Sequence, residues 1–191
     1  MNMPKLPVFD ASSPLRPARF GHIVLKSPKF AEMTAWYKRF LNAEAMFENP
    51  LGAFLTYDDE HHRVFILNAP GASPRDPNAA GLAHFAYLFN SLSDLLSAYE
   101  RLKGEGVTPA YCVNHGFQLS FYYNDPDGNE AELGCDVFVT REELDKWFAN
   151  GAFAANVFGY TFSAEKVLAA HKAGATDAAL FEGTYQNGEY Q

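Results

Sequence analysis

The sequence has few cysteines and few basic residues, and both shortages exclude classes of function. Its 191 residues include two cysteines, Cys112 and Cys135, and no CxxC pair, which excludes zinc-ribbon and thioredoxin-type sites. Lysine and arginine together number 15 against 23 aspartates and glutamates, so the net charge is −8, and no basic stripe occurs. Nucleic acid is therefore not an expected partner, because its phosphates are bound by clustered positive charge.

Long apolar runs are also missing. No window approaches the ~20 apolar residues that a membrane-spanning helix needs, and the first 20 residues contain no signal-peptide core. We therefore expect a cytoplasmic protein without a membrane partner, whose cysteines are reduced thiols. Apolar residues are otherwise plentiful, at 48%, and 17 Phe and 10 Tyr predict a core or a pocket lined by rings.

The order of predicted elements occurs twice in the chain. A strand at 19–26 is followed by a helix that we expect to begin at Ser27-Pro28, and then by three short strands up to residue 68. After a Pro- and Gly-rich linker at 69–81, a strand at 82–90, a helix and three more strands repeat the pattern. The predicted fold is α+β, with two βαβββ units forming one sheet that curls around a central cavity.

Two flanking regions complete the predicted organisation: an extended arm over 1–18, which contains four prolines, and a helical tail over 137–191. In the tail, Thr140 and Glu143 form a predicted capping box, and Ser163 begins a second helix. The loop "GAFAANVFGY" (151–160) lies between these helices. Packing within the domain or against a partner subunit is the favoured role of the tail, although this loop is also a candidate cover for a pocket mouth.

Histidines at equivalent places in the two repeats are candidate metal ligands. His22 and His84 lie 62 positions apart, each early in the first strand of its unit. A single histidine in an apolar strand is more often a satisfied core group, but two at equivalent positions, with a carboxylate on a third strand, favour a metal site. Two histidines and one carboxylate are the ligands of non-haem Fe(II) oxygenases. Glu130 and Glu132 both follow a predicted turn at 125–128 and share a strand face, so alternation leaves the choice open.

Residues 19–136, with their paired units and turn-plus-glutamate ending, resemble the vicinal oxygen chelate superfamily. Within them, "VNHGFQLSFYYNDPDGNEAE" (113–132) resembles the signature of type I extradiol ring-cleaving dioxygenases. The resemblance implies that Glu132 rather than Glu130 is the ligand, and that His115 and Tyr122 line the pocket as catalytic residues. The alternatives are ordinary aromatic packing for Tyr122 and a turn position for His115.

The segment "DDEHHRVFIL" (58–67) carries a further candidate. By itself it predicts an exposed polar turn, but the resemblance implies that His62 is the acid–base catalyst, and an imidazole titrates near neutral pH. Phe65 departs from the family pattern, which usually has a smaller residue there. Ile66 aligns with Glu132 in the repeat. Glyoxalase I and other four-ligand relatives have a ligand at this place, so Ile66 argues for three ligands and against glyoxalase chemistry.

The expected function is that of an Fe(II)-dependent extradiol dioxygenase that inserts O₂ into a catechol and opens its ring, with Mn(II) as the alternative metal. The domain over 19–136 is similar to one-module enzymes named 2,3-dihydroxybiphenyl dioxygenases. Two alternatives remain: another metal-dependent lyase, isomerase or thiol transferase on the same scaffold, and a non-enzymatic protein that binds small aromatics. We expect a homo-oligomer, because pairing of chains protects exposed sheet edges.

Overall fold

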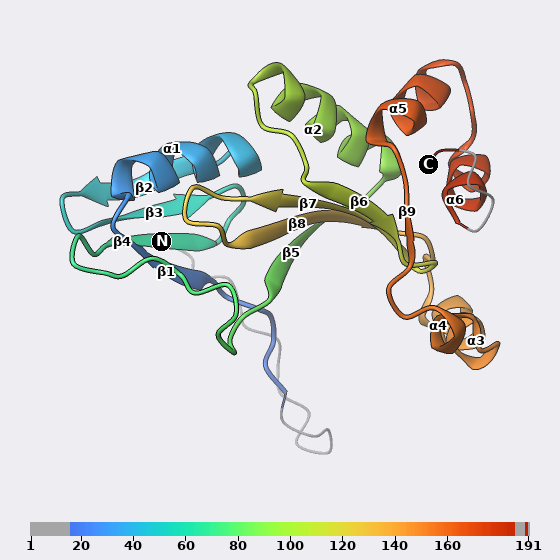
Figure 1. Cartoon of the computed structure of the whole chain (residues 1–191), viewed down its shortest axis with the longest axis horizontal. Helices are drawn as coiled ribbons and strands as arrows, with labels where there is room; N and C mark the ends of the chain where they lie inside the picture. Colours follow the sequence, from blue (N-terminus) through green and yellow to red (C-terminus); the bar gives the residue numbers. More distant parts are fainter. Residues whose placement is uncertain (1–15, 186–189, 191) are drawn as a thin grey trace, which may run out of the picture.

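A computed structural model describes residues 16–185 and 190, so most of the predicted arm over 1–18 lies outside the described residues. Each half of the paired domain contains the predicted βαβββ order (Figure 1). The first unit consists of β1 (Ile23–Ser27), α1 (Phe30–Leu41), β2 (Glu44–Asn49), β3 (Gly52–Thr56) and β4 (Val64–Asn68). The second consists of β5 (His84–Phe89), α2 (Leu92–Gly104), β6 (Tyr111–Asn114), β7 (Gln118–Asn124) and β8 (Glu130–Asp136).

The strands form two hydrogen-bonded sheets instead of the single sheet expected from the sequence. The first has the order β1-β4-β3-β2, and the second has the order β5-β8-β7-β6-β9, where β9 (Tyr160–Thr161) comes from the C-terminal region. In both sheets the first strand of the unit pairs in parallel with the last, and the other pairs are antiparallel. The α+β class and the repeat are confirmed. The predicted single sheet is divided between β1 and β5, because each of these is an edge strand of its own sheet.

Helices α1 and α2 lie on one side of the two sheets (Figure 1). Their apolar faces bury Met33, Tyr37 and Phe40 of α1 and a row of leucines of α2 in a single core. Fixing the rings and leucines between helix and sheet removes large apolar areas from water, which is the main source of stability in such a layered domain. The opposite faces of the sheets remain available for a site.

Strand pairing corrects the predicted counterpart of Glu132. On β5, Ala86 pairs with Glu132, and the equivalent residue of β1, Val24, pairs with Phe65. Phe65 is thus the structural counterpart, whereas Ile66 points to the opposite face and is fully buried. Side chains alternate between faces, so an alignment error of one residue exchanges the two faces of the strand. The three-ligand interpretation is unchanged, because phenylalanine cannot coordinate a metal either.

The predicted turn before β8 forms and is tied to the first unit. Asp125 accepts backbone hydrogen bonds from Asp127 at 2.9 Å and Asn129 at 2.8 Å, and Gly128 has a φ of 79°, which favours glycine. The Tyr37 hydroxyl of α1 donates to Asp125 Oδ2 at 2.9 Å. This buried contact joins the two repeats and fixes the position from which β8 starts.

The C-terminal region adds helices around one end of the second sheet (Figure 1). These are α3 (Arg141–Ala149), α4 (Ala152–Ala155), α5 (Ala164–Lys172) and α6 (Asp177–Thr184). The Thr140–Glu143 capping box and the Ser163 N-cap form as predicted. Helix α1, in contrast, begins at Phe30, because Ser27 still belongs to β1. In the part of the chain that the structure describes, none of the helices combines the length and apolar character needed to cross a membrane.

Candidate active site

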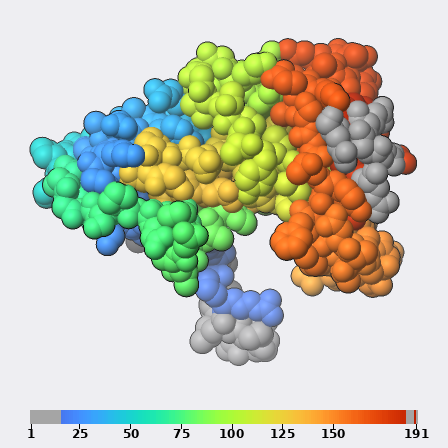
Figure 2. Space-filling view, in the orientation of Figure 1, coloured from blue at the N-terminus to red at the C-terminus, as the bar shows by residue number. Residues whose placement is uncertain are grey.

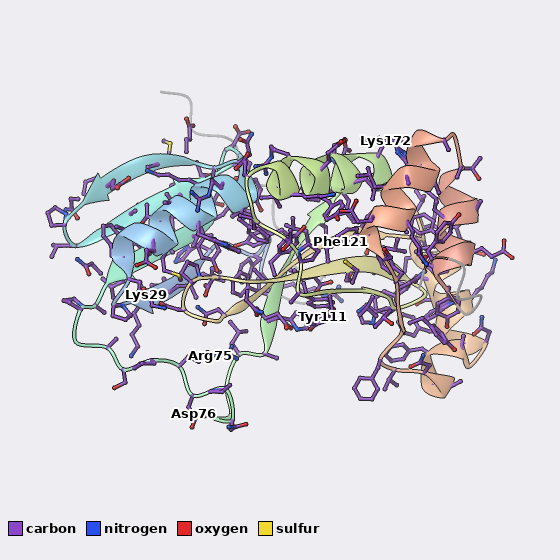
Figure 3. The ribbon with its side chains drawn as sticks, turned by 45° about the horizontal axis from the view of Figure 1, so that its top comes forward. Lys29, Arg75, Asp76, Tyr111, Phe121 and Lys172 are labelled. Carbon is purple, nitrogen blue, oxygen red and sulfur yellow. The ribbon has the colours of Figure 1, made fainter. Side chains whose placement is uncertain are left out.

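The face of the second sheet away from α2 carries the candidate ligands. Figure 3 shows Phe121 between this sheet and α2 and Tyr111 on the opposite side, which is the side of the site. His84 is the first residue of the edge strand β5 and pairs with Glu130 of the neighbouring strand β8. Glu132 lies two residues further along β8, on the same face as Glu130. The His84 Nε2 and Glu132 Oε2 atoms are 3.2 Å apart. Two of the three predicted ligands are therefore in contact.

Glu132 is a buried carboxylate with few partners. Only 2% of its surface is exposed, although it belongs to a residue type that is rarely buried unless paired. Ser120, on the neighbouring strand β7, directs its Oγ–H to Glu132 Oε1 at 2.5 Å, and His84 contacts the other oxygen. A buried negative charge is costly unless a cation or several hydrogen bonds compensate it. The position therefore suits a carboxylate that binds a metal ion.

Glu130 is more than a solvent-end residue of β8. Its Oε1 atom lies 3.7 Å from Nδ1 of His84, and its Oε2 accepts a hydrogen bond of 2.8 Å from the Tyr111 hydroxyl. The His84 ring thus lies between two carboxylates, with Nδ1 toward Glu130 and Nε2 toward Glu132. A carboxylate beside the non-ligating nitrogen is the usual way in which a metal-binding histidine is oriented. Glu130 is therefore placed where a carboxylate that orients His84 would lie.

His115 and Tyr122 form a second pair beside these residues. The Tyr122 hydroxyl and His115 Nε2 are 3.0 Å apart, and Tyr122 pairs with Glu132 across β7 and β8. Burial, followed by the charge of Glu132, raises the pKa of Tyr122 to about 12, so the phenol keeps its proton at neutral pH. Burial lowers the pKa of His115, which favours the neutral imidazole, and a neutral ring protonated at Nδ1 is able to accept the tyrosine hydrogen bond at Nε2.

His22 and His62 lie together at one end of the first sheet, just before β1 and β4. Their ring centroids are 4.1 Å apart, and the His62 ring also stacks on Phe54 at 4.2 Å. His62 is 6% exposed, and its Nδ1 lies 2.5 Å from Nδ1 of His61. Burial, followed by the proximity of His22 and His61, lowers the pKa of His62. The predicted site residues therefore form two groups, His22 with His62 and His84 with Glu132, His115 and Tyr122.

The strands that carry these two groups adjoin each other. One cavity is lined by Val24 of β1 and by Leu82, just before β5, and another is lined by Ile23 of β1 and Ala86 of β5. Within residues 16–185 and 190, however, no three His, Cys, Asp or Glu side chains are gathered closely enough to hold a metal ion. His22 contacts the His62 ring instead of joining His84 and Glu132.

The types of side chain among the proposed ligands nevertheless suit a divalent transition metal. Two imidazoles and one carboxylate suit Fe(II) or Mn(II), and the orientation of His84 between two carboxylates supports such a role. His84 and Glu132 fit in position as well, with the buried carboxylate facing the nitrogen that is free to ligate. His22 lies just before β1 and packs against the His62 ring, which leaves it outside this pair.

Several residues of the site were not identified from the sequence. Ser120 and Tyr111 contact the candidate carboxylates, and Val157 and Phe158 line the same cavity as His84 and Tyr122. Ser120 could have been identified from the sequence, because it lies two residues before Tyr122 and therefore on the same face of β7. Val157 and Phe158 lie in the loop over 151–160, whose sequence favours packing and is also compatible with a cover for a pocket mouth.

Comparison with known proteins agrees with this architecture. Residues 19–133 match the family model described as the Glyoxalase/Bleomycin resistance protein/Dioxygenase superfamily. The chain is 41% identical over 157 residues to biphenyl-2,3-diol 1,2-dioxygenase 2 of Rhodococcus globerulus, covering 82% of this chain and 83% of that protein. It is 39% identical over 164 residues to biphenyl-2,3-diol 1,2-dioxygenase 3 of the same organism, covering 85% and 86%.

Solved structures share the fold at lower identity. A glyoxylase/bleomycin resistance protein/dioxygenase domain from Frankia sp. EAN1pec superposes with a TM-score of 0.54 at 17% identity, covering 68% of this chain and 99% of that one. A glyoxalase/dioxygenase from Nostoc punctiforme has a TM-score of 0.52 at 21% identity, covering 68% and 100%. These likenesses concern the fold, whereas the family match and the two relatives concern the sequence over most of its length. The chain belongs to the Glyoxalase/Bleomycin resistance protein/Dioxygenase superfamily, the vicinal oxygen chelate proteins, and is a relative of dioxygenases within it.

Proposed function

We propose that this protein is an Fe(II)-dependent extradiol dioxygenase that opens the ring of a catechol beside its two hydroxyl groups. The observation that carries the proposal is the buried Glu132 in contact with His84, next to the hydrogen-bonded His115 and Tyr122. The activity for which the two relatives are named, dioxygenation of biphenyl-2,3-diol, supports a catecholic substrate. Both atoms of O₂ enter the product of such a reaction, so no external reductant is needed.

His22, His84 and Glu132 would hold the ion, through two imidazole nitrogens and one carboxylate. Bound there, iron supplies the redox chemistry that lets an electron-rich catechol react with O₂. The protein contributes ligand orientation, through the contacts of Ser120 with Glu132 and of Glu130 with His84. Mn(II) prefers the same ligand types and is the alternative metal.

Tyr122 and His115 bind the substrate oxygens. The Tyr122 hydroxyl retains its proton, because its pKa is raised to about 12, and so it acts as a hydrogen-bond donor. With no ligand the hydroxyl lies 3.0 Å from His115 Nε2, and with a catechol in the cavity it donates to a substrate oxygen. His115 then has a free Nε2 with which to accept a hydrogen bond from a substrate hydroxyl, and the pair fixes the ring relative to Glu132.

His62 acts as the acid–base residue. Its lowered pKa keeps the imidazole neutral at pH 7, so that it is able to accept a proton. Nδ1 contacts His61, which leaves Nε2 as the atom that takes the catechol proton and later returns it. The His62 ring lies against His22, with ring centroids 4.1 Å apart, which puts the proposed acid–base residue beside a proposed ligand.

Anaerobic purification, loading with Fe(II) and mixing with catechol or 2,3-dihydroxybiphenyl in air tests the proposal. We expect a yellow ring-fission product and one bound metal per chain. Glu132→Ala abolishes metal binding and product, and Glu130→Ala weakens metal binding by roughly tenfold, because it removes support for a ligand rather than the ligand. A wild-type protein that binds neither iron nor manganese and converts no catechol would refute the proposal.

The same measurements separate the alternatives. A metal-binding protein that leaves every catechol intact but converts another substrate is a lyase, isomerase or transferase of the same scaffold. A protein that binds aromatics equally well before and after Glu132→Ala, with no metal and no product, is a binding protein.

A further inference from the structure

A cavity of about 230 Å³ lies over the His115–Tyr122 pair. Its lining residues come from two parts of the chain: His84, Tyr111, Val113, His115 and Tyr122 belong to the second sheet and the loop after β6, and Val157 and Phe158 belong to the segment before β9. Figure 2 shows this C-terminal segment, in orange, standing against the yellow-green strands at one end of the molecule. The C-terminal region therefore contributes directly to the wall of the candidate active site.

The segment is fixed in place by strand pairing. β9 is the fifth strand of the second sheet, and its Tyr160 pairs with Asn114 of β6. Gly159 precedes it with a φ of 77°, and a Cβ at this position would lie 2.5 Å from the backbone oxygen of Asn114. Only glycine tolerates this conformation and this close approach, so the sequence before β9 is held against the strand that leads to His115.

Hydrogen bonds of one side chain shape the turn that carries the two apolar residues. Asn156 Oδ1 accepts from the backbone N–H of Phe158 at 3.2 Å and of Gly159 at 3.1 Å, while its Nδ2 donates to the Gly159 oxygen at 2.8 Å. The asparagine thus satisfies the backbone of a tight turn. Val157 and Phe158 are thereby positioned at the cavity without being part of a helix or strand.

Their apolar surfaces are open in the structure. Phe158 is 84% exposed and Val157 is 48% exposed, although both line the cavity. The residues that the second sheet and its β6–β7 loop contribute to the cavity include the polar groups of His84, His115 and Tyr122. A ligand that matches this distribution is polar at one end and apolar at the other, as is a catechol that carries an aromatic substituent.

We propose that Val157 and Phe158 form the wall that receives the aromatic substituent of a biaryl diol, and that Phe158 determines the preference for such substrates over unsubstituted catechol. The assignment rests on the proposed dioxygenase function. The catechol hydroxyls lie toward His115 and Tyr122, and the second ring contacts the phenyl ring of Phe158. Burial of that exposed ring on binding favours the larger substrate, and aromatic contact adds to it.

Phe158→Ala tests this assignment, with Phe158→Leu as the conservative variant and Phe47→Ala as the control. Phe47 is a half-exposed phenylalanine of β2, on the first sheet. In the iron-loaded enzyme we expect the ratio of kcat/KM for 2,3-dihydroxybiphenyl to that for catechol to fall roughly tenfold in Phe158→Ala, less in Phe158→Leu, and not in Phe47→Ala. An unchanged ratio in Phe158→Ala overturns the assignment.

Equilibrium binding separates this inference from the proposed function. Under anaerobic conditions, calorimetry with metal-free protein measures the Kd for 2,3-dihydroxybiphenyl, and we expect it to rise by roughly tenfold in Phe158→Ala. If the wild type converts no catechol but this loss is seen, the dioxygenase function fails and the apolar wall stands. If catechols are converted and the ratio does not change in Phe158→Ala, the function stands and the wall is refuted.

Discussion

Replacing Ser120 by alanine tests whether Glu132 is held as a metal ligand. Ser120 is fully buried, and its hydroxyl donates to Glu132 Oε1 at 2.5 Å, so the substitution removes one hydrogen bond from the carboxylate without removing the carboxylate. A hydrogen bond to a charged group contributes about 1.5–3 kcal/mol. Losing the partner of a metal-binding group typically lowers metal affinity by about 10–100-fold. We expect the Kd for Mn(II) to rise within that range.

Electron paramagnetic resonance of free Mn(II) during titration of metal-free protein measures this Kd directly. Ser97→Ala is the matched control, since Ser97 on α2 donates to the backbone oxygen of Ser93 in an exposed position. Circular dichroism should be unchanged in both variants. If Ser120→Ala binds Mn(II) as tightly as the wild type, or if Ser97→Ala loses as much affinity, the assignment of Glu132 as an oriented ligand is wrong.

Three further predictions concern other parts of the molecule. Tyr37→Phe removes the buried hydrogen bond to Asp125 and should lower the free energy of unfolding by about 2 kcal/mol, measured by urea denaturation; an unchanged midpoint would contradict this. Burial raises the pKa of the Cys112 thiol to about 12 and that of Cys135 to about 11, so native protein at pH 8 should resist iodoacetamide and react once unfolded, as counted by mass spectrometry. His62→Phe should leave Mn(II) binding intact and depress turnover; full turnover would refute its acid–base role.

Local sequence patterns were sufficient to predict most of the fold. The helical spacing of apolar residues, the turn at 125–128 and the caps at Thr140 and Ser163 depend on residues close together in the chain, and each of them forms. The start of α1 was wrong by two residues, because Ser27 pairs with Asn68 of β4, and strand pairing outweighed its preference for a helix start.

The pairing register between strands was harder to predict from the sequence than the strands and turns themselves. Aligning the repeats by their last strands placed Ile66 opposite Glu132, whereas pairing of β1 with β4 gives that place to Phe65. Alignment by sequence treats one residue of offset as a small error, but in a sheet it exchanges the two faces.

Order and spacing along the chain were enough to predict the repeat, the α+β class and the matching places of His22 and His84 in the two units. The preference for Glu132 over Glu130 as a ligand came from the resemblance to extradiol dioxygenases, and it stays a prediction. The tertiary structure was needed to find that Glu130 lies beside Nδ1 of His84, that His22 packs against the His62 ring, and that Phe158 lines the cavity. Such contacts join residues far apart in sequence, and they follow from how sheets and the C-terminal region pack, which no local pattern encodes.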